Sequence, residues 1–87
     1  MGEVTWESAA AEQFDALPRP IKARVLRLVE RLQNWPEVSG ARLLAGELAG
    51  HWRMRTGDYR LQFRVEGREV IIERVGHRDG FYDGAGS

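Results

Sequence analysis

Residues 51–60 read HWRMRTGDYR, and the pattern in this segment predicts how the rest of the chain is organised. Apolar and polar residues alternate before and after Gly57-Asp58, as they do in strands with one face toward a core. Glycine first in a two-residue loop indicates a β-hairpin, because glycine tolerates the positive φ that the turn requires. We therefore predict two antiparallel strands, 51–56 and 59–65, whose directly opposed residues have numbers that sum to 115.

This register separates apolar residues from arginines. The predicted pairs are Met54–Leu61 and Trp52–Phe63 on the core face, and Arg55–Arg60 and Arg53–Gln62 on the opposite face. Like charges directly opposite each other destabilise a strand pair, and such local penalties concentrate at functional sites. Two structural explanations stay open: Glu73 or Asp58 neutralises the pair of arginines, or water solvates it.

The segment before the hairpin predicts a short strand and a helix. Val4 and Trp6 in the stretch GEVTW suit one face of a strand, and AAAEQFDAL has apolar residues at helical spacing. Ser8 or Thr5 is the expected N-cap of that helix, because a hydroxyl oxygen accepts a bond from a free amide. Pro18, with Pro20, ends this helix and opens the next one, where a missing amide hydrogen costs nothing.

The second helix has the clearest periodicity in the chain. Its apolar stripe consists of Ile21, Val25, Leu28, Val29 and Leu32, and NWPEVSG ends it. Two short helices cannot bury this stripe between themselves, so we expect the helical hairpin to pack on the sheet. A turn at 66–68 leads to a last strand, EVIIERV, which ends at Gly76.

These elements predict an α+β fold of β-α-α-β-β-β order, with a twisted antiparallel sheet and both helices on one face. The 87 residues suffice for one domain, which we place at 1–83, with a flexible tail at 84–87.

Composition excludes several classes of function. The chain has no cysteine and only two histidines, so we expect no disulfide, thiolate site, metal centre or cofactor. No apolar run approaches the ~18 residues of a membrane span, and no signal peptide opens the chain. We expect a soluble cytoplasmic protein that does not bind a membrane.

The net charge of zero conceals segregated charges. Residues 1–18 hold four acidic residues and no basic one, whereas 19–50 hold six basic and three acidic residues. Residues 51–78 hold seven arginines against four acidic residues. An acidic beginning and a basic remainder indicate two electrically different surfaces, although scattered solvating charges give the same composition.

The segments LLAGELAGHWRMRTGDYRLQFRV and IIERVGHRDGFY together resemble the RelE/ParE superfamily of type II toxins, over residues 4–82. The shared features are a Leu…Gly linker, an Arg-x-Arg strand, the GDYR turn and a closing VGHR…Y. RelE-type members are mRNA interferases that cut message in the ribosomal A site, whereas ParE-type members poison DNA gyrase and generally lack the catalytic residues. The resemblance also implies a cognate antitoxin as partner.

The resemblance implies a set of site residues. Arg60 matches the middle-strand arginine of the RelE-type site, Arg78 the late arginine and Tyr82 the terminal tyrosine. Arg53 and Arg55 match two basic residues, lysines in the best-known members, that bind RNA. His77 sits where some relatives have a catalytic histidine and others a lysine.

Cleavage without a metal uses the 2′-hydroxyl of the RNA as nucleophile. The enzyme must deprotonate that hydroxyl, hold the charge that grows on the phosphorane and protonate the leaving 5′-oxygen. Arginine suits the second task because its planar fork donates to two phosphate oxygens and keeps its charge. The general base is either His77 or Tyr82.

We therefore predict a ribosome-dependent endoribonuclease toxin, with a gyrase inhibitor of the ParE type as the alternative. A third possibility is a degenerate relative that only binds an antitoxin. Outside the family context, His77 and Tyr82 have ordinary structural roles, the first as a hydrogen-bonded residue at a strand end and the second as a packed aromatic.

Overall fold

A computed structural model describes residues 3–81 of the chain. One five-stranded sheet has the strand order β1-β5-β4-β3-β2. Its strands are β1 (Glu3–Trp6), β2 (Arg42–Leu43), β3 (His51–Thr56), β4 (Tyr59–Glu66) and β5 (Glu69–His77). The helices are α1 (Ser8–Asp15), α2 (Arg19–Leu32), a short 3₁₀ turn η1 (Gly46–Leu48) and α3 (Arg78–Phe81).

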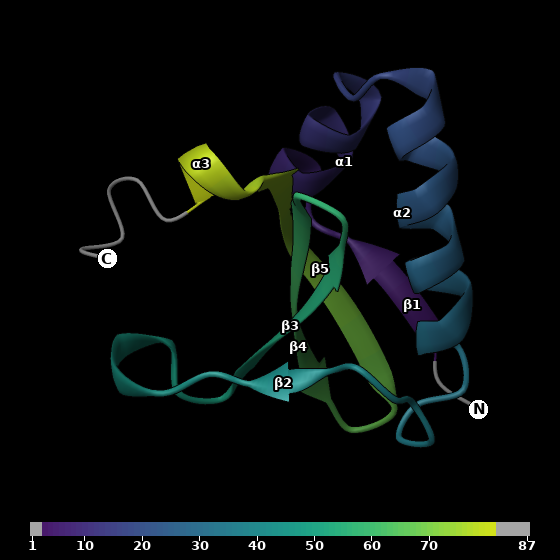
Figure 1. The fold of residues 1–87 in the computed structure, drawn as a ribbon. Coiled ribbons are helices and arrows are strands. Elements are labelled where there is room, and N and C mark those ends of the chain that lie inside the picture. Colours follow the sequence, from purple (N-terminus) through teal and green to yellow (C-terminus); the bar gives the residue numbers. More distant parts are fainter. Residues whose placement is uncertain (1–2, 82–87) are drawn as a thin grey trace.

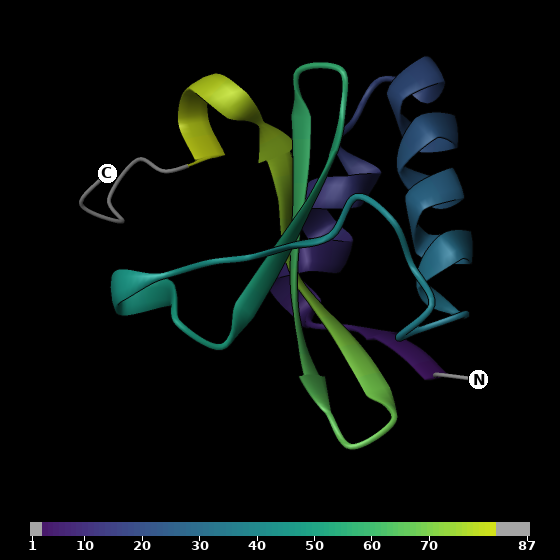
Figure 2. The same ribbon diagram turned by 60° about the horizontal axis from the view of Figure 1, so that its bottom comes forward.

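The helices α1 and α2 cover one face of the sheet, while α3 lies on the other side (Figures 1 and 2). We call the covered side the helix face and the opposite side the outer face. The predicted α+β class and the packing of a helical hairpin on one face are confirmed.

The sheet differs from the prediction in two respects, because it is mixed rather than antiparallel and because it has a fifth strand, β2. β1 runs parallel to β5, with Val4 opposite Val70 and Trp6 opposite Ile72. Three elements, β2, η1 and α3, were not predicted, and the expected tail at 84–87 lies outside the described residues.

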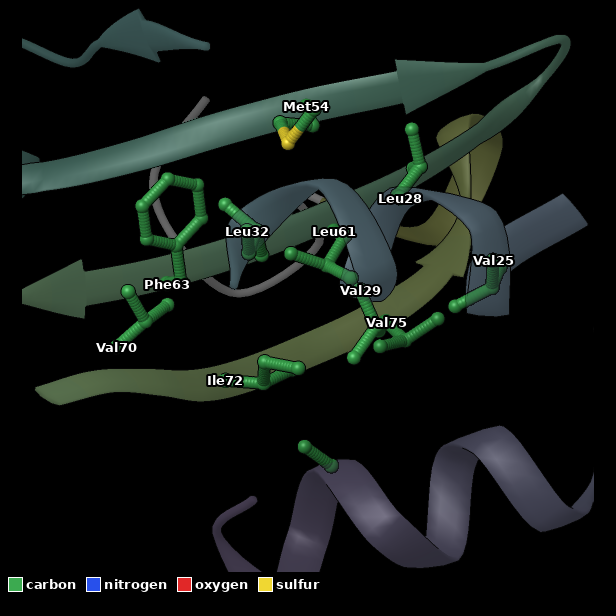
Figure 3. Close-up of a cluster of buried hydrophobic side chains, with 11 residues drawn as sticks. Val25, Leu28, Val29, Leu32, Met54, Leu61, Phe63, Val70, Ile72 and Val75 are labelled. Carbon is green, nitrogen blue, oxygen red and sulfur yellow. The ribbon is translucent and has the colours of Figure 1, made fainter. Parts of the chain in front are cut away.

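The core lies between the apolar stripe of α2 and the helix face of the sheet (Figure 3). Its most deeply buried side chains are Phe63, Leu32, Met54, Leu61, Ile72, Val25 and Val70. Ala10 from α1 joins them, and Trp35 and Trp52 pack against the cluster from its edge. The strand alternation read from the sequence therefore places the apolar residues of β3 and β4 on the helix face correctly, although Gln62 on the outer face is also buried.

The start of α1 differs from the expectation, whereas the start of α2 agrees with it. Neither Ser8 nor Thr5 caps α1; its N-cap is Glu7, without a capping bond from the side chain. Instead, the backbone N–H of Glu7 donates to the carbonyl of Ile72 at 2.9 Å, so the parallel strand pair extends into the helix start. Pro18 is the N-cap of α2 and Pro20 lies in its first turn, as the prolines predicted.

Candidate functional site

The β3–β4 hairpin has the predicted register. Arg55 lies opposite Arg60, Arg53 opposite Gln62, and both apolar pairs lie on the helix face. Gly57 has φ +58°, which explains why the turn requires glycine at its first position. The hairpin thus places three arginines of two neighbouring strands on the outer face.

Two further arginines extend this group across the sheet. Arg42 on β2 lies opposite Arg53, and Arg74 on β5 lies opposite Gln62. One row of the outer face therefore runs through four strands as Arg42, Arg53, Gln62 and Arg74.

A β-bulge brings Arg74 to the outer face. The register of β4 and β5 shifts between Gln62 and Phe63. Ile72 and Val75 are both buried in the core, so the two residues between them, Glu73 and Arg74, both project from the outer face. Regular alternation would have given only one of them this orientation.

Arg60 has the environment of an anion-binding residue. Among residues 3–81, its Nε is buried without a hydrogen-bond partner, and its Nη1 reaches only the carbonyl of Gly57, at 3.5 Å. Gly76 lies directly opposite on β5, so no side chain covers Arg60 from that strand. A donor that is desolvated without a partner costs free energy, which an incoming phosphate oxygen would recover.

Arg53 and Arg55 line an open cavity of about 220 Å³ together with Gly40, Ala41 and Arg42. The cavity lies at the β2–β3 edge of the outer face, beside the Arg55–Arg60 pair. Three guanidinium groups around one hollow favour a phosphate group or another oxyanion.

Arg78 follows β5 directly and is exposed. Its backbone N–H donates to the carbonyl of Asp58 at 2.7 Å, which continues the β4–β5 ladder. Its Nε lies 3.8 Å from Asp58 Oδ1 and 3.6 Å from Asp79 Oδ1. These are long, exposed ion pairs that contribute little, so they leave the guanidinium available to a stronger anion.

His77 is the predicted site residue that the structure separates from Arg60. Alternation places it on the side of Val75, where its ring lies edge-on to Tyr59 with the centroids 5.2 Å apart. Its Nδ1 accepts the backbone N–H of Asp79 at 3.1 Å. Tyr82 lies outside the described residues.

Arg64, the next outward arginine of β4, is fully engaged by carboxylates. It donates to Glu66 at 2.7 Å, to Glu7 at 2.8 Å and to Glu73 at 3.0 Å. These bonds raise the pKa of Arg64 above its already high ordinary value. Neutralisation of the Arg55–Arg60 pair by Glu73 or Asp58 is one alternative that the sequence leaves open; Glu73 engages Arg64 instead, and Asp58 pairs with Arg78.

Glu73 also binds His51 and Gln62. Its Oε1 lies 2.6 Å from His51 Nδ1 and accepts a bond from Gln62 Nε2 at 3.3 Å. Burial alone would raise the pKa of Glu73, but the bonds from His51, Gln62 and Arg64 outweigh it and hold the pKa below its ordinary value. The outer face thus has a neutralised end at Arg64 and a basic end at Arg55 and Arg60.

Residues 3–81 contain no group of histidine and acidic side chains arranged to hold a metal ion. Within the same part of the chain, no helix has the length and apolar character needed to cross a membrane.

Residues 4–80 match the family described as the ParE toxin of the type II toxin-antitoxin system parDE. The chain belongs to this toxin family. Toxin RelE3 of Methanocaldococcus jannaschii is 31% identical over 84 residues, which cover 93% of this chain and 96% of that relative. The predicted membership of the RelE/ParE superfamily is therefore confirmed, and the chain is a toxin of a type II toxin-antitoxin system.

Solved structures of superfamily members share the fold. A chain of the RelBE2 toxin-antitoxin complex from Mycobacterium tuberculosis is 30% identical, with a TM-score of 0.77 over 88% of this chain and 98% of that one. The isolated E. coli RelE toxin has a TM-score of 0.75 over 98% of this chain and 95% of its own, at 15% identity, which shows the shared fold alone.

Proposed function

We propose that this toxin is a ribosome-dependent endoribonuclease that cuts mRNA in the ribosomal A site. The observation that carries the proposal is the Arg55–Arg60 pair on the outer face, where neither guanidinium has a carboxylate partner among residues 3–81. Two cations held face to face without neutralisation suit a site for phosphate groups. The likeness to proteins named RelE supports the same branch of the superfamily.

Cleavage would proceed by attack of the 2′-oxygen on the adjacent phosphorus, with departure of the 5′-oxygen and formation of a 2′,3′-cyclic phosphate. Arg60 and Arg78 would donate to the phosphorane oxygens, and Arg53 and Arg55 would hold the flanking phosphates. No step of this mechanism requires a metal ion or a cofactor.

We assign the general base to Tyr82 in preference to His77. His77 points to the helix face with Tyr59, whereas Arg60 points to the outer face. The phenol of Tyr82 has an ordinary pKa of about 10, and arginines around it would lower that pKa by stabilising the phenolate. Tyr82→Phe should abolish cleavage while His77→Gln retains most of it.

Primer extension on a translated message tests the nuclease. Cuts within codons should appear with the wild-type toxin and weaken by roughly 10²- to 10³-fold in Arg60→Ala and in Arg78→Ala, as for the loss of one preorganised donor. Arg68→Ala, in the β4–β5 turn and remote from the arginine group, serves as the control and should cut like the wild type. Uncut message with the wild-type toxin would contradict the proposal.

The family match favours a second candidate, inhibition of DNA gyrase, because that family is named for ParE. Gyrase-dependent DNA breaks together with intact message would establish this alternative.

We also infer a cognate antitoxin. The similar M. tuberculosis and M. jannaschii structures are toxin-antitoxin complexes. An acidic antitoxin segment that covers Arg60 or displaces the chain around Tyr82 would block the proposed site, and a structure of the complex that leaves both exposed would contradict this form of inhibition.

A further inference from the structure

The basic surface extends beyond the proposed site onto α2. Three arginines of this helix, Arg24, Arg27 and Arg31, are exposed and share one flank. At 3.6 residues per turn they lie within roughly 60° of one another, whereas Arg19 and Lys22 lie on the opposite flank. Within residues 3–81, none of the three has a carboxylate partner, and only Arg31 has a hydrogen-bond partner, Ser39.

Two contacts join this flank to the outer face. Arg24 approaches the β3–β4 turn, where its Nη1 lies 3.4 Å from the position that a Cβ on Gly57 would occupy. The carbonyl of the same Gly57 accepts from Arg60. Figures 1 and 2 both show this turn beside the N-terminal half of α2.

The second contact lies at the other end of the helix. Arg31 Nη2 lies 3.4 Å from the Cβ position of Gly40, and it donates to the carbonyl of Ser39. Gly40 also lines the cavity formed by Arg42, Arg53 and Arg55. We call the resulting surface the arginine belt: Arg24, Arg27 and Arg31 on α2, with Arg42, Arg55 and Arg60 on the outer face.

We propose that the arginine belt binds the phosphate backbone of RNA over a track longer than the cleavage site, passing from the outer face around the β2–β3 edge to α2. The inference rests on the proposed function in taking RNA as the ligand.

The geometry favours RNA over an acidic protein segment. The belt lies on two faces of the molecule, so its ligand must bend around an edge while presenting a negative charge at every step. A phosphodiester strand carries one charge per nucleotide and bends freely, whereas a straight acidic helix reaches only one face. The exclusive use of arginine also matches phosphate, whose oxygens accept two bonds from one guanidinium fork.

Salt-dependent binding of a fluorescein-labelled single-stranded RNA of 30 nucleotides, without ribosomes, tests the belt. Each phosphate contact to a single strand contributes about 0.7 to the slope of log affinity against log salt concentration. The triple variant Arg24→Gln/Arg27→Gln/Arg31→Gln should therefore lose about 2 units of slope. Raising the salt concentration from 50 to 200 mM weakens the affinity of both proteins. The factor lost by the variant should be roughly 20 times smaller than the factor lost by the wild type.

The matched control removes the same charge elsewhere. Arg19→Gln/Lys22→Gln/Arg68→Gln also lowers the net charge by three, but all three residues lie off the belt. It should keep the wild-type slope, and circular dichroism should show both triple variants folded. Equal losses in the two variants, or no loss in the α2 variant, would overturn the proposal. So would binding of an oligoglutamate peptide in the absence of RNA binding.

The experiments distinguish failure of the arginine-belt proposal from failure of the nuclease proposal. If the α2 variant loses slope while no message is cut, the belt stands and the nuclease fails. If cleavage depends on Arg60 and the α2 variant binds RNA like the wild type, the nuclease stands and the belt fails.

Discussion

Arg60 and Arg64 lie four residues apart on the same strand and face, yet their surroundings give them opposite roles. Arg64 donates to three carboxylates and links the residue before α1, Glu7, to β4 and β5. In the described part of the chain, Arg60 has only the carbonyl of Gly57, at the long limit of a hydrogen bond. One is therefore a structural arginine, and the other is available to a ligand.

Substituting each arginine separates these roles. Arg60→Ala should lower cleavage by roughly 10²- to 10³-fold with an unchanged melting temperature, whereas Arg64→Ala should lower the melting temperature and leave the cleavage pattern intact. Primer extension and thermal unfolding measure the two effects. A large loss of cleavage in a well-folded Arg64→Ala variant would mean that the roles are assigned wrongly.

Glu73 predicts how stability depends on pH. Because its pKa is lower in the folded chain than in the unfolded chain, it stabilises the fold above the ordinary carboxylate pKa, and this contribution is lost as the pH falls through the folded value. Glu73→Gln should therefore lose less stability than the wild type on acidification from pH 6 to pH 3. Urea unfolding across this range measures the difference, with Glu47→Gln, outside the network, expected to follow the wild type.

Among the elements, the β3–β4 hairpin depends most on its turn. Gly57 has φ +58°, a conformation that costs other residues about 1 kcal/mol or more. Gly67, at φ +62° in the β4–β5 turn, is the matched position, with no atom within 4 Å of its Cβ site.

Alanine at either glycine should cost about 1 kcal/mol of stability in urea unfolding. Only Gly57→Ala should also reduce cleavage, because Arg60 and Arg24 both approach this turn. If Gly67→Ala reduced cleavage equally, general destabilisation would explain the effect.

The hairpin was predictable because the position of a two-residue loop determines which residues of the two strands lie opposite each other. The bulge in β5 was not predictable, because nothing in the sequence EVIIERV shows whether one residue or two consecutive residues point to the outer face. Arg74 was therefore missed as a residue of the outer face. Arg42 was missed because β2 has only two residues, too few for alternation to be visible. The parallel direction of β1 depends on the path of α1 and α2 between distant segments, which local patterns do not encode.

Considered as a whole, the molecule keeps its basic and acidic residues apart while its net charge is zero. The arginine belt is one consequence, and acidic and basic groups meet in the network around Arg64 and at Arg78. The fold depends chiefly on burial of the apolar core, and the partly buried network around Arg64 adds to its stability.

Leu32 tests that dependence. It is fully buried, so Leu32→Ala should cost about 2–5 kcal/mol, a large part of the stability of a domain this small. Leu26, which is 46% exposed on the same helix, is the control, and Leu26→Ala should cost far less. Equal losses in urea unfolding would show that α2 does not pack on the sheet as described.

The strand order has a consequence for synthesis. β5 pairs with β1 on one side and β4 on the other, yet it is the last strand to leave the ribosome. Until it emerges, the N-terminal strand has no neighbour and Arg74 cannot complete its row. The proposed site is therefore complete only after β5 has left the ribosome and has joined the first strand to the rest of the sheet.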